Sequence, residues 1–186
     1  RMKYIERWAL MRNTYPETLS EHSLEVSMLA HALCVIGNVR YGKHLDADKA
    51  AVIGLYHDAS EILTGDLPTP IKYHNAEIMS AYHAVEDLAV QKLLGMLPPE
   101  LRETYAAVLA EDKDGDIYPL VKAADKLSAY IKCIEERKAG NNEFLSAEAQ
   151  TRAALEASPL PEVQYFLEHF IPAFERDLDE LGAIGQ

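Results

Sequence analysis

Cysteine is scarce in this sequence, which contains only Cys34 and Cys133 and has no C-x-x-C pair. Two thiols this far apart exclude a disulfide framework or a zinc ribbon, and we interpret both as core residues. Long apolar runs and a secretory signal are also missing from the 186 residues. We therefore expect a cytoplasmic protein that does not span a membrane.

Positive charge is the next scarcity, because 18 Lys and Arg stand against 30 Asp and Glu and give a formal net charge of -12. This balance disfavours a nucleic-acid backbone or an anionic membrane as the main partner. A small anionic substrate is still compatible with it, provided that a metal and a few cations reverse the field locally.

Strand signals, internal repeats, low-complexity tracts and linkers are almost absent. The hydrophobic content of 48% suffices for one well-buried domain, and the apolar residues recur with helical spacing. The sequence therefore predicts a single all-α bundle, with a kink in the last helix at Pro172. Helices are expected at residues 2–12, 19–37, 46–63, 74–97, 99–111, 117–139, 146–157 and 162–181.

Chemistry is first indicated by the adjacent pair His57-Asp58 and by Glu61. In a helix over 46–63, His57 and Glu61 lie one turn apart on the inward face, and Asp58 lies about 100° round from His57. A surface acid is the plainer interpretation of Glu61, but the inward face disfavours it. Both His57 and Asp58 can reach one ion above the groove between them.

Two further polar residues occupy apolar helical stripes. Thr18-Leu-Ser-Glu21 predicts a capping box, and His22 follows it within the stripe of that helix. Taken alone, His22 can be a core histidine bonded to backbone, and Asp125 can be an N-cap or an ion-paired acid. Together with His57 and Asp58 they form a mixed N/O set suited to one divalent cation such as zinc, manganese, cobalt or iron.

These four residues, His22, His57, Asp58 and Asp125, match the H…HD…D pattern and resemble the HD-domain phosphohydrolases. The flanking segments resemble the bacterial 5′-deoxynucleotidase branch of that superfamily, and the likeness covers nearly the whole chain. It implies one HD domain over residues 1–186, with a few natural residues missing before Arg1 and a frayed tail at 182–186. The segments are Arg7-Trp8, Met11-Arg12-Asn13, Ser20-Glu-His-Ser23, Tyr56-His-Asp-Ala-Ser-Glu61, Thr64-Gly-Asp-Leu-Pro-Thr-Pro70 and Ala139-Gly-Asn-Asn-Glu-Phe144.

The resemblance implies a metal-dependent hydrolase that converts deoxyribonucleoside 5′-monophosphates to deoxynucleosides and phosphate, working as a homodimer. It implies one divalent ion, of cobalt, manganese, zinc or similar, on the four ligands. It also implies that Glu61 is the general acid/base and that Arg7 orients the phosphate. Without the resemblance, an Arg in an amphipathic helix would be a surface residue.

The same resemblance assigns the sugar contacts. Trp8, the only tryptophan, would cover the 2′ carbon and disfavour a ribose hydroxyl, and Asp66 would accept the 3′-hydroxyl. From the residues alone, Trp8 would be a core residue and Asp66 a turn acid. The implied substrate-binding set is Arg7, Trp8, His22, Asp66, Leu67, Pro68 and Thr69.

Two alternatives stay open. Another HD phosphohydrolase could act on a nucleoside triphosphate, a cyclic dinucleotide or an alarmone, although a triphosphate calls for more cations than Arg7, Arg12 and Lys72 supply. A helical interaction domain could instead keep its metal for stability alone. The presence of Glu61 and Arg7 beside all four ligands disfavours this second alternative.

Overall fold

The computed structural model describes residues 1–72, 74–110 and 115–182, and within these ranges it does not describe the side chains at 69, 181 and 182. All regular elements of these ranges are helical, so the all-α prediction is confirmed. The elements are η1 (Met2–Tyr4), α1 (Leu19–Tyr41), α2 (Ala47–Tyr56), α3 (Glu61–Thr64), α4 (Thr69–Lys72), α5 (Ala76–Gly95), α6 (Pro99–Leu109), α7 (Tyr118–Lys138), η2 (Asn142–Phe144), α8 (Leu145–Glu156), α9 (Pro161–His169), α10 (Ile171–Phe174) and α11 (Leu178–Gly182).

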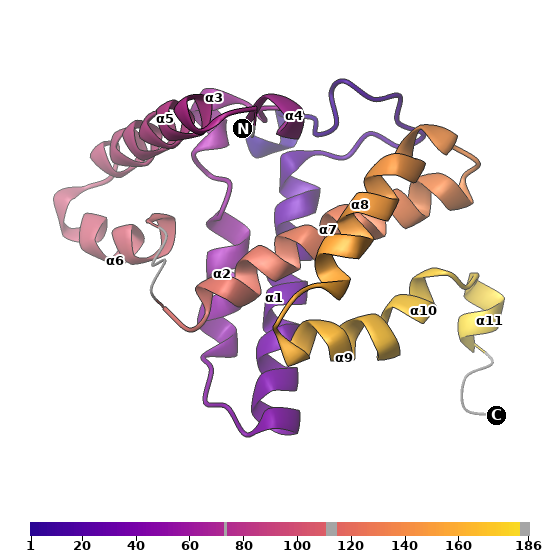
Figure 1. The fold of residues 1–186 in the computed structure, drawn as a ribbon. Coiled ribbons are helices and arrows are strands. Elements are labelled where there is room, and N and C mark those ends of the chain that lie inside the picture. The colour runs from indigo at the N-terminus through magenta and orange to yellow at the C-terminus, as the bar shows by residue number, and fades with distance from the viewer. Residues whose placement is uncertain (73, 111–114, 183–186) are drawn as a thin grey trace.

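The centre of the molecule is formed by α1 and α2, which lie side by side, and by α7, which crosses them (Figure 1). Helices α8 and α9 cover α7 and α1 on one side, and α5 with α6 extends from the other. The apolar core fills the crossing, and the burial of its side chains is the main stabilising term. Its large, almost fully buried members include Val26, Leu33, Leu120, Leu127, Ile131, Ile134, Leu155 and Phe166.

Helices α1 and α2 approach each other most closely at Gly54. A Cβ atom on Gly54 would lie 2.8 Å from the Cα of Ser27, a distance that real Cβ atoms essentially never show. Only glycine therefore permits this helix spacing. The contact fixes the end of α2, and so His57, against the first half of α1.

The N-terminal segment differs from the prediction of a helix over 2–12. Only Met2–Tyr4 is helical, as one 3-10 turn. The backbone then pairs with the segment before α1: Arg7 N–H donates to the Glu17 carbonyl at 2.9 Å, and Leu19 N–H donates to the Ile5 carbonyl at 2.8 Å. These contacts join residues more than ten positions apart and override the local helical pattern.

The carboxylate of Glu136 fastens this segment to α7. It accepts hydrogen bonds from the backbone N–H of Thr14 at 2.8 Å and of Tyr15 at 3.3 Å. It also accepts from the Asn141 amide at 2.8 Å and the Lys132 ammonium at 2.5 Å. Glu136 is buried, its bond from Lys132 is buried as well, and the bonds from Thr14, Tyr15 and Asn141 are partly buried.

The predicted helix over 46–63 is interrupted. Its N-cap at Asp46 forms as expected, with a side-chain bond to the Lys49 N–H at 2.9 Å, but α2 ends at Tyr56. Bonds to the third preceding residue then wind the chain tightly up to α3, as from Glu61 N–H to the Asp58 carbonyl at 3.0 Å. Continuous helical periodicity in the sequence does not distinguish this tighter winding from an α-helix.

The remaining boundaries follow the predictions with smaller differences. The capping box of Thr18 and Glu21 at the start of α1 is confirmed. The last predicted helix, 162–181, divides into α9, α10 and α11, with Pro172 in the first turn of α10, where its missing N–H is tolerated. Residue 111 of the predicted helix 99–111 and residues 183–186 of the expected frayed tail lie outside the described residues. Among the described helices, none is long and apolar enough to cross a membrane.

Candidate metal centre and substrate site

Three elements bring the four expected ligands together. His22 comes from the first turn of α1, His57 and Asp58 from the turn after α2, and Asp125 from the middle of α7. Ligand atoms of His22, His57 and Asp125 all lie within 4.8 Å of one another. A carboxylate oxygen of Asp58 lies 3.1 Å from His57 Nε2 and 3.5 Å from His22 Nε2.

Both imidazoles turn Nε2 toward a carboxylate, which lies 3.1 Å away at Asp58 for His57 and 3.2 Å away at Asp125 for His22. His57 Nδ1 lies 2.7 Å from the Gly54 carbonyl, which only accepts, so Nδ1 carries the proton and Nε2 keeps a lone pair. The Nε2 atoms of His22 and His57 are both buried and have no hydrogen-bond partner. Two such orphaned nitrogens facing two carboxylates fit a divalent cation, which would satisfy all four groups.

Charge within the cluster explains the direction of each pKa shift. Burial lowers the pKa of His22, but its contacts with Asp125 and Asp58 outweigh burial and raise it. Burial raises the pKa of Asp125, but the approach of His22 Nε2 to 3.2 Å and the charge of His57 outweigh burial and lower it. A cation bound here would replace the histidine protons as the positive partner of both acids.

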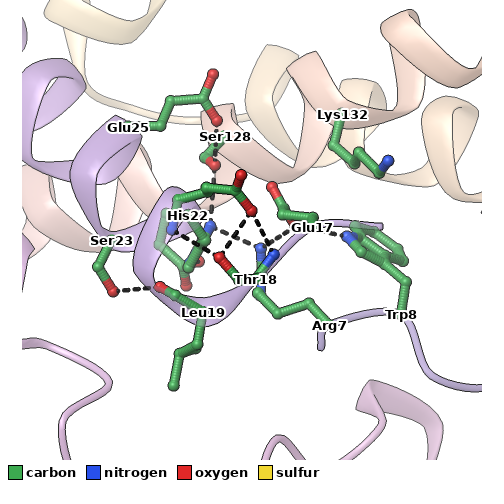
Figure 2. A network of polar contacts seen from close by, with 12 residues as sticks. Arg7, Trp8, Glu17, Thr18, Leu19, His22, Ser23, Glu25, Ser128 and Lys132 are labelled. Carbon is green, nitrogen blue, oxygen red and sulfur yellow. Dashed lines mark hydrogen bonds and ion pairs between the residues drawn. The ribbon is translucent and has the colours of Figure 1, made fainter. Parts of the chain in front are cut away.

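His22 is supported by two residues that the sequence reasoning missed. Its Nδ1 lies 2.9 Å from the hydroxyl of Ser128, which donates in turn to Glu25 at 2.5 Å (Figure 2). Ser128 is fully buried on α7, one turn beyond Asp125. The one signal for Ser128 in the sequence is its place one turn from Asp125, because a serine on a helix is otherwise commonplace.

Arg7 and Trp8 adjoin the cluster through a third missed residue, Glu17. One oxygen of Glu17 accepts from Arg7 Nη1 at 2.9 Å and from Trp8 Nε1 at 3.0 Å (Figure 2). Arg7 Nη1 also lies 2.6 Å from His22 Nδ1. Trp8 is half-buried, with a left-handed backbone (φ 60°) and its ring centroid 5.2 Å from that of Phe144. Arg7 is thus no free surface residue, and Trp8 is joined to it through Glu17.

Glu61 opens α3, immediately after the turn that holds His57 and Asp58. Its side chain is buried, and Oε2 has no hydrogen-bond partner. Burial first, and then the negative charges of Asp58 and Asp66, raise the pKa of Glu61 to about 9. The expectation of an inward-facing acid near the ligands therefore agrees with its position.

Asp66 begins the loop between α3 and α4, after Gly65 with φ 75°. Burial raises its pKa, while the charge of Arg7 is the largest opposing influence. Leu67 and Pro68 continue this loop and are half-buried, and the Pro68 carbonyl accepts from the N–H of Ile71 at 2.8 Å. Thr69 starts α4, and its side chain lies outside the described residues.

Solved structures define the class to which this fold belongs. An HD-domain phosphohydrolase from Listeria innocua superposes with a TM-score of 0.82 at 24% identity, covering 93% of this chain and 84% of the other. The cyanophage S-2L HD phosphohydrolase, bound to dA and one catalytic Zn²⁺ ion, gives a TM-score of 0.59 at 24% identity, covering 97% and 94%. The fold is therefore that of the HD-domain phosphohydrolases.

Sequence relatives narrow the class to a family. The family model "5′-deoxynucleotidase YfbR-like" matches residues 1–174. The 5′-deoxynucleotidase YfbR of Shigella flexneri serotype 5b is 52% identical over 183 residues, covering 98% of this chain and 92% of the relative. That of Escherichia coli K12 is 51% identical over the same extent. The chain belongs to the YfbR-like 5′-deoxynucleotidase family, as the resemblance of its motifs implied.

Proposed function

We propose that this protein hydrolyses deoxyribonucleoside 5′-monophosphates to deoxynucleosides and phosphate with the help of one divalent cation. The observation that carries the proposal is the pair of buried, unpartnered Nε2 atoms of His22 and His57, which face two carboxylates beside a buried Glu61. Membership of the 5′-deoxynucleotidase family supports this choice of substrate.

The cation would be held by His22 Nε2, His57 Nε2 and the carboxylates of Asp58 and Asp125. When bound, such an ion polarises a phosphoryl oxygen and lowers the pKa of a water ligand. Its two positive charges are balanced by two carboxylates, while neutral imidazoles complete the set. We propose zinc, manganese or cobalt as the ion.

Arg7 provides the positive charge for the phosphate. If His22 binds through Nε2, its Nδ1 carries a proton, which it donates to Ser128, and Ser128 donates to Glu25. Arg7 Nη1, held by Glu17 at 2.9 Å, then finds no acceptor in His22 Nδ1 at 2.6 Å, so the guanidinium N–H groups that Glu17 does not use would bind an incoming phosphate. A guanidinium suits this task because it stays protonated.

Glu61 would act as the general acid/base. Burial and the negative charges of Asp58 and Asp66 raise the pKa of Glu61 and so favour its protonated form, which would donate a proton to the leaving 5′ oxygen. The resulting carboxylate can accept a proton from water. Asp66 would accept the sugar 3′-hydroxyl, Trp8 would cover the 2′ carbon, and Leu67, Pro68 and Thr69 would line the sugar side of the site.

Phosphate release from dAMP and AMP tests the proposal, after chelation and with Zn²⁺, Mn²⁺ or Co²⁺ restored. We expect turnover only with a cation and a higher kcat/KM for dAMP. His57→Ala and Asp125→Ala should lose both bound metal, by elemental analysis, and turnover, whereas His44→Ala, an exposed histidine, should keep both. Turnover confined to triphosphates, cyclic dinucleotides or alarmones would instead assign another HD activity.

A catalytically silent metal-stabilised domain is the remaining alternative. It predicts bound metal without phosphate release from any of these compounds. Glu61→Ala separates the two cases, because a hydrolase should lose turnover in this variant while its metal content stays unchanged.

We further propose that the protein is a homodimer that pairs through the outer face of α1. Four exposed apolar side chains, Leu24, Met28, Val35 and Val39, form one stripe on this face, opposite the core. The stripe is nearly symmetric about His31, so a two-fold axis there would set Leu24 against Val39 and Met28 against Val35. Light scattering should give a dimer for the wild type and a monomer for Met28→Lys; Leu88→Lys, on the exposed side of α5, is the control.

A further inference from the structure

Arg7 and Trp8 are neighbours in sequence, yet a backbone bond alone does not fix the directions of their long side chains. Both converge on Glu17, ten and nine residues downstream, on the same oxygen atom (Figure 2). The side chains of Arg7 and Glu17 are only 14% and 11% exposed, so this ion pair is shielded from water. A shielded, charge-assisted bond holds its partners far more firmly than a surface pair does.

Trp8 needs such a restraint because its backbone is left-handed, at φ 60°. A bulky residue in this region is strained by about 1–2 kcal/mol, so other contacts must keep it there. The Trp8 carbonyl accepts from the Met11 N–H at 2.9 Å and from the Asn13 amide at 3.4 Å, which hold the backbone. The indole itself has the Nε1 bond to Glu17 at 3.0 Å and ring contacts with Phe144 at 5.2 Å between centroids and with the Arg7 guanidinium at 5.9 Å. The bond to Glu17 is the directional one, because a ring contact leaves the indole free to slide and tilt.

We infer that Glu17 is a positioning residue for sugar selectivity, which fixes the Trp8 indole and the Arg7 guanidinium relative to each other through one carboxylate oxygen. It rests on the proposed function. Glu17 acts through Arg7 and Trp8 and is no catalytic residue. Arg7 would contact the phosphate and Trp8 the sugar. Because both side chains bond to one oxygen of Glu17, the distance between the guanidinium and the indole is fixed before substrate binds.

The test compares Glu17→Leu, which removes both bonds, with Glu17→Gln, whose carbonyl oxygen can still accept from Trp8 Nε1. The preference for dAMP over AMP in kcat/KM should fall about tenfold in Glu17→Leu, approaching that of Trp8→Ala. In Glu17→Gln the preference should be largely restored, while KM for both nucleotides rises because Arg7 has lost its ionic partner. Glu6→Gln removes the same charge from an exposed position of the segment and should match the wild type.

Tryptophan emission gives a readout that does not depend on activity, because Trp8 is the only tryptophan. Glu17→Leu should shift the emission to longer wavelength and increase quenching by acrylamide, with unchanged helicity by circular dichroism. Unchanged emission and an unchanged dAMP preference in folded Glu17→Leu would overturn the role of Glu17. A wild-type enzyme without preference for dAMP would contradict the proposed function. The acrylamide quenching of Glu17→Leu would still show whether Glu17 holds Trp8: increased quenching supports this contact, and unchanged quenching contradicts it.

Discussion

At Glu61, burial and the neighbouring negative charges both favour the protonated form of the carboxyl group. Its pKa is raised to about 9 by burial and by the charges of Asp58 and Asp66. The folded protein therefore binds the Glu61 proton more tightly than the unfolded chain does. The raised pKa that would suit Glu61 to its proposed role as proton donor also makes its ionised form unfavourable in the fold.

We predict that Glu61→Gln stabilises the metal-free protein at alkaline pH. Below the ordinary pKa of 4.5 the folded and unfolded states both hold the proton, so the variant and the wild type should be similar. As the pH rises toward 9, Glu61 ionises in the unfolded wild type but stays protonated in the folded protein. The free energy of unfolding of the wild type therefore falls, by several kcal/mol as an order of magnitude. Glu61→Gln has no such group and escapes this loss.

Urea denaturation of chelated protein between pH 5 and pH 9 measures this difference. The exposed substitution Glu103→Gln on α6 is the control and should follow the wild type. A difference in the free energy of unfolding between Glu61→Gln and the wild type that stays constant with pH would contradict a raised pKa of Glu61. Adding a divalent cation should reduce this difference in the free energy of unfolding, because nearby positive charge favours the ionised form of Glu61.

At the scale of elements, the site depends on how closely α2 approaches α1 at Gly54. His57 follows α2 by one residue and donates from Nδ1 to the carbonyl of Gly54. The same glycine therefore permits the helix contact and orients the imidazole. A shift of α2 away from α1 would move His57 away from His22.

Gly54→Ala should consequently destabilise the fold and weaken metal binding together. The new Cβ would lie 2.8 Å from the Ser27 backbone, which cannot yield as a flexible side chain would, and overpacking of this kind costs about 1–3 kcal/mol. Gly95→Ala is the matched control, because a Cβ there meets nothing within 4 Å and alanine favours helix by up to about 1 kcal/mol. Thermal melting and metal titration of both variants check this; a Gly54→Ala protein that binds metal like the wild type would contradict it.

The sequence predicted most helices because their apolar spacing and caps are local signals, as at Thr18 and Asp46. It also directed attention to His22 and Asp125, since polar groups in apolar stripes need partners. It did not predict the irregular course of residues 5–18, the tight turn at 57–60, or the contacts of Glu17 and Ser128. Those features depend on residues that meet only in the folded chain, and a glutamate or serine at such positions is unremarkable in sequence.

At the scale of the whole molecule, Glu136 joins the N-terminal segment to the helical core. Its carboxylate accepts from Lys132 on its own helix, from the backbone of Thr14 and Tyr15, and from Asn141. Although burial opposes ionisation, the bonds from Lys132, Asn141 and Thr14 lower the pKa of Glu136 to about 2. The N-terminal segment is therefore attached through an ionised, buried acid.

We predict that Glu136→Gln lowers the free energy of unfolding by about 3 kcal/mol at neutral pH, the equivalent of a shift from 4.5 to about 2. Because the folded pKa is depressed, the contribution is present above pH 4.5 and disappears as pH falls toward 2. The difference from wild type should therefore shrink between pH 5 and pH 3. Denaturant titrations at these values measure it, with the exposed Glu168→Gln as control; a pH-independent difference would point to lost packing instead of lost charge.

The proposed substrate contacts of Arg7 and Trp8 lie on a different part of the chain from the proposed metal ligands. The proposed metal ligands belong to α1, α7 and the turn after α2, whereas Arg7 and Trp8 belong to an irregular segment that ends at the Thr18 cap. Residues 5–18 contribute none of the proposed metal ligands, and their contact with the buried ring of Phe144 is made by Trp8. If Arg7 and Trp8 select the substrate as proposed, exchanging the 14 residues 5–18 between relatives should alter the sugar preference while leaving the proposed metal ligands in place.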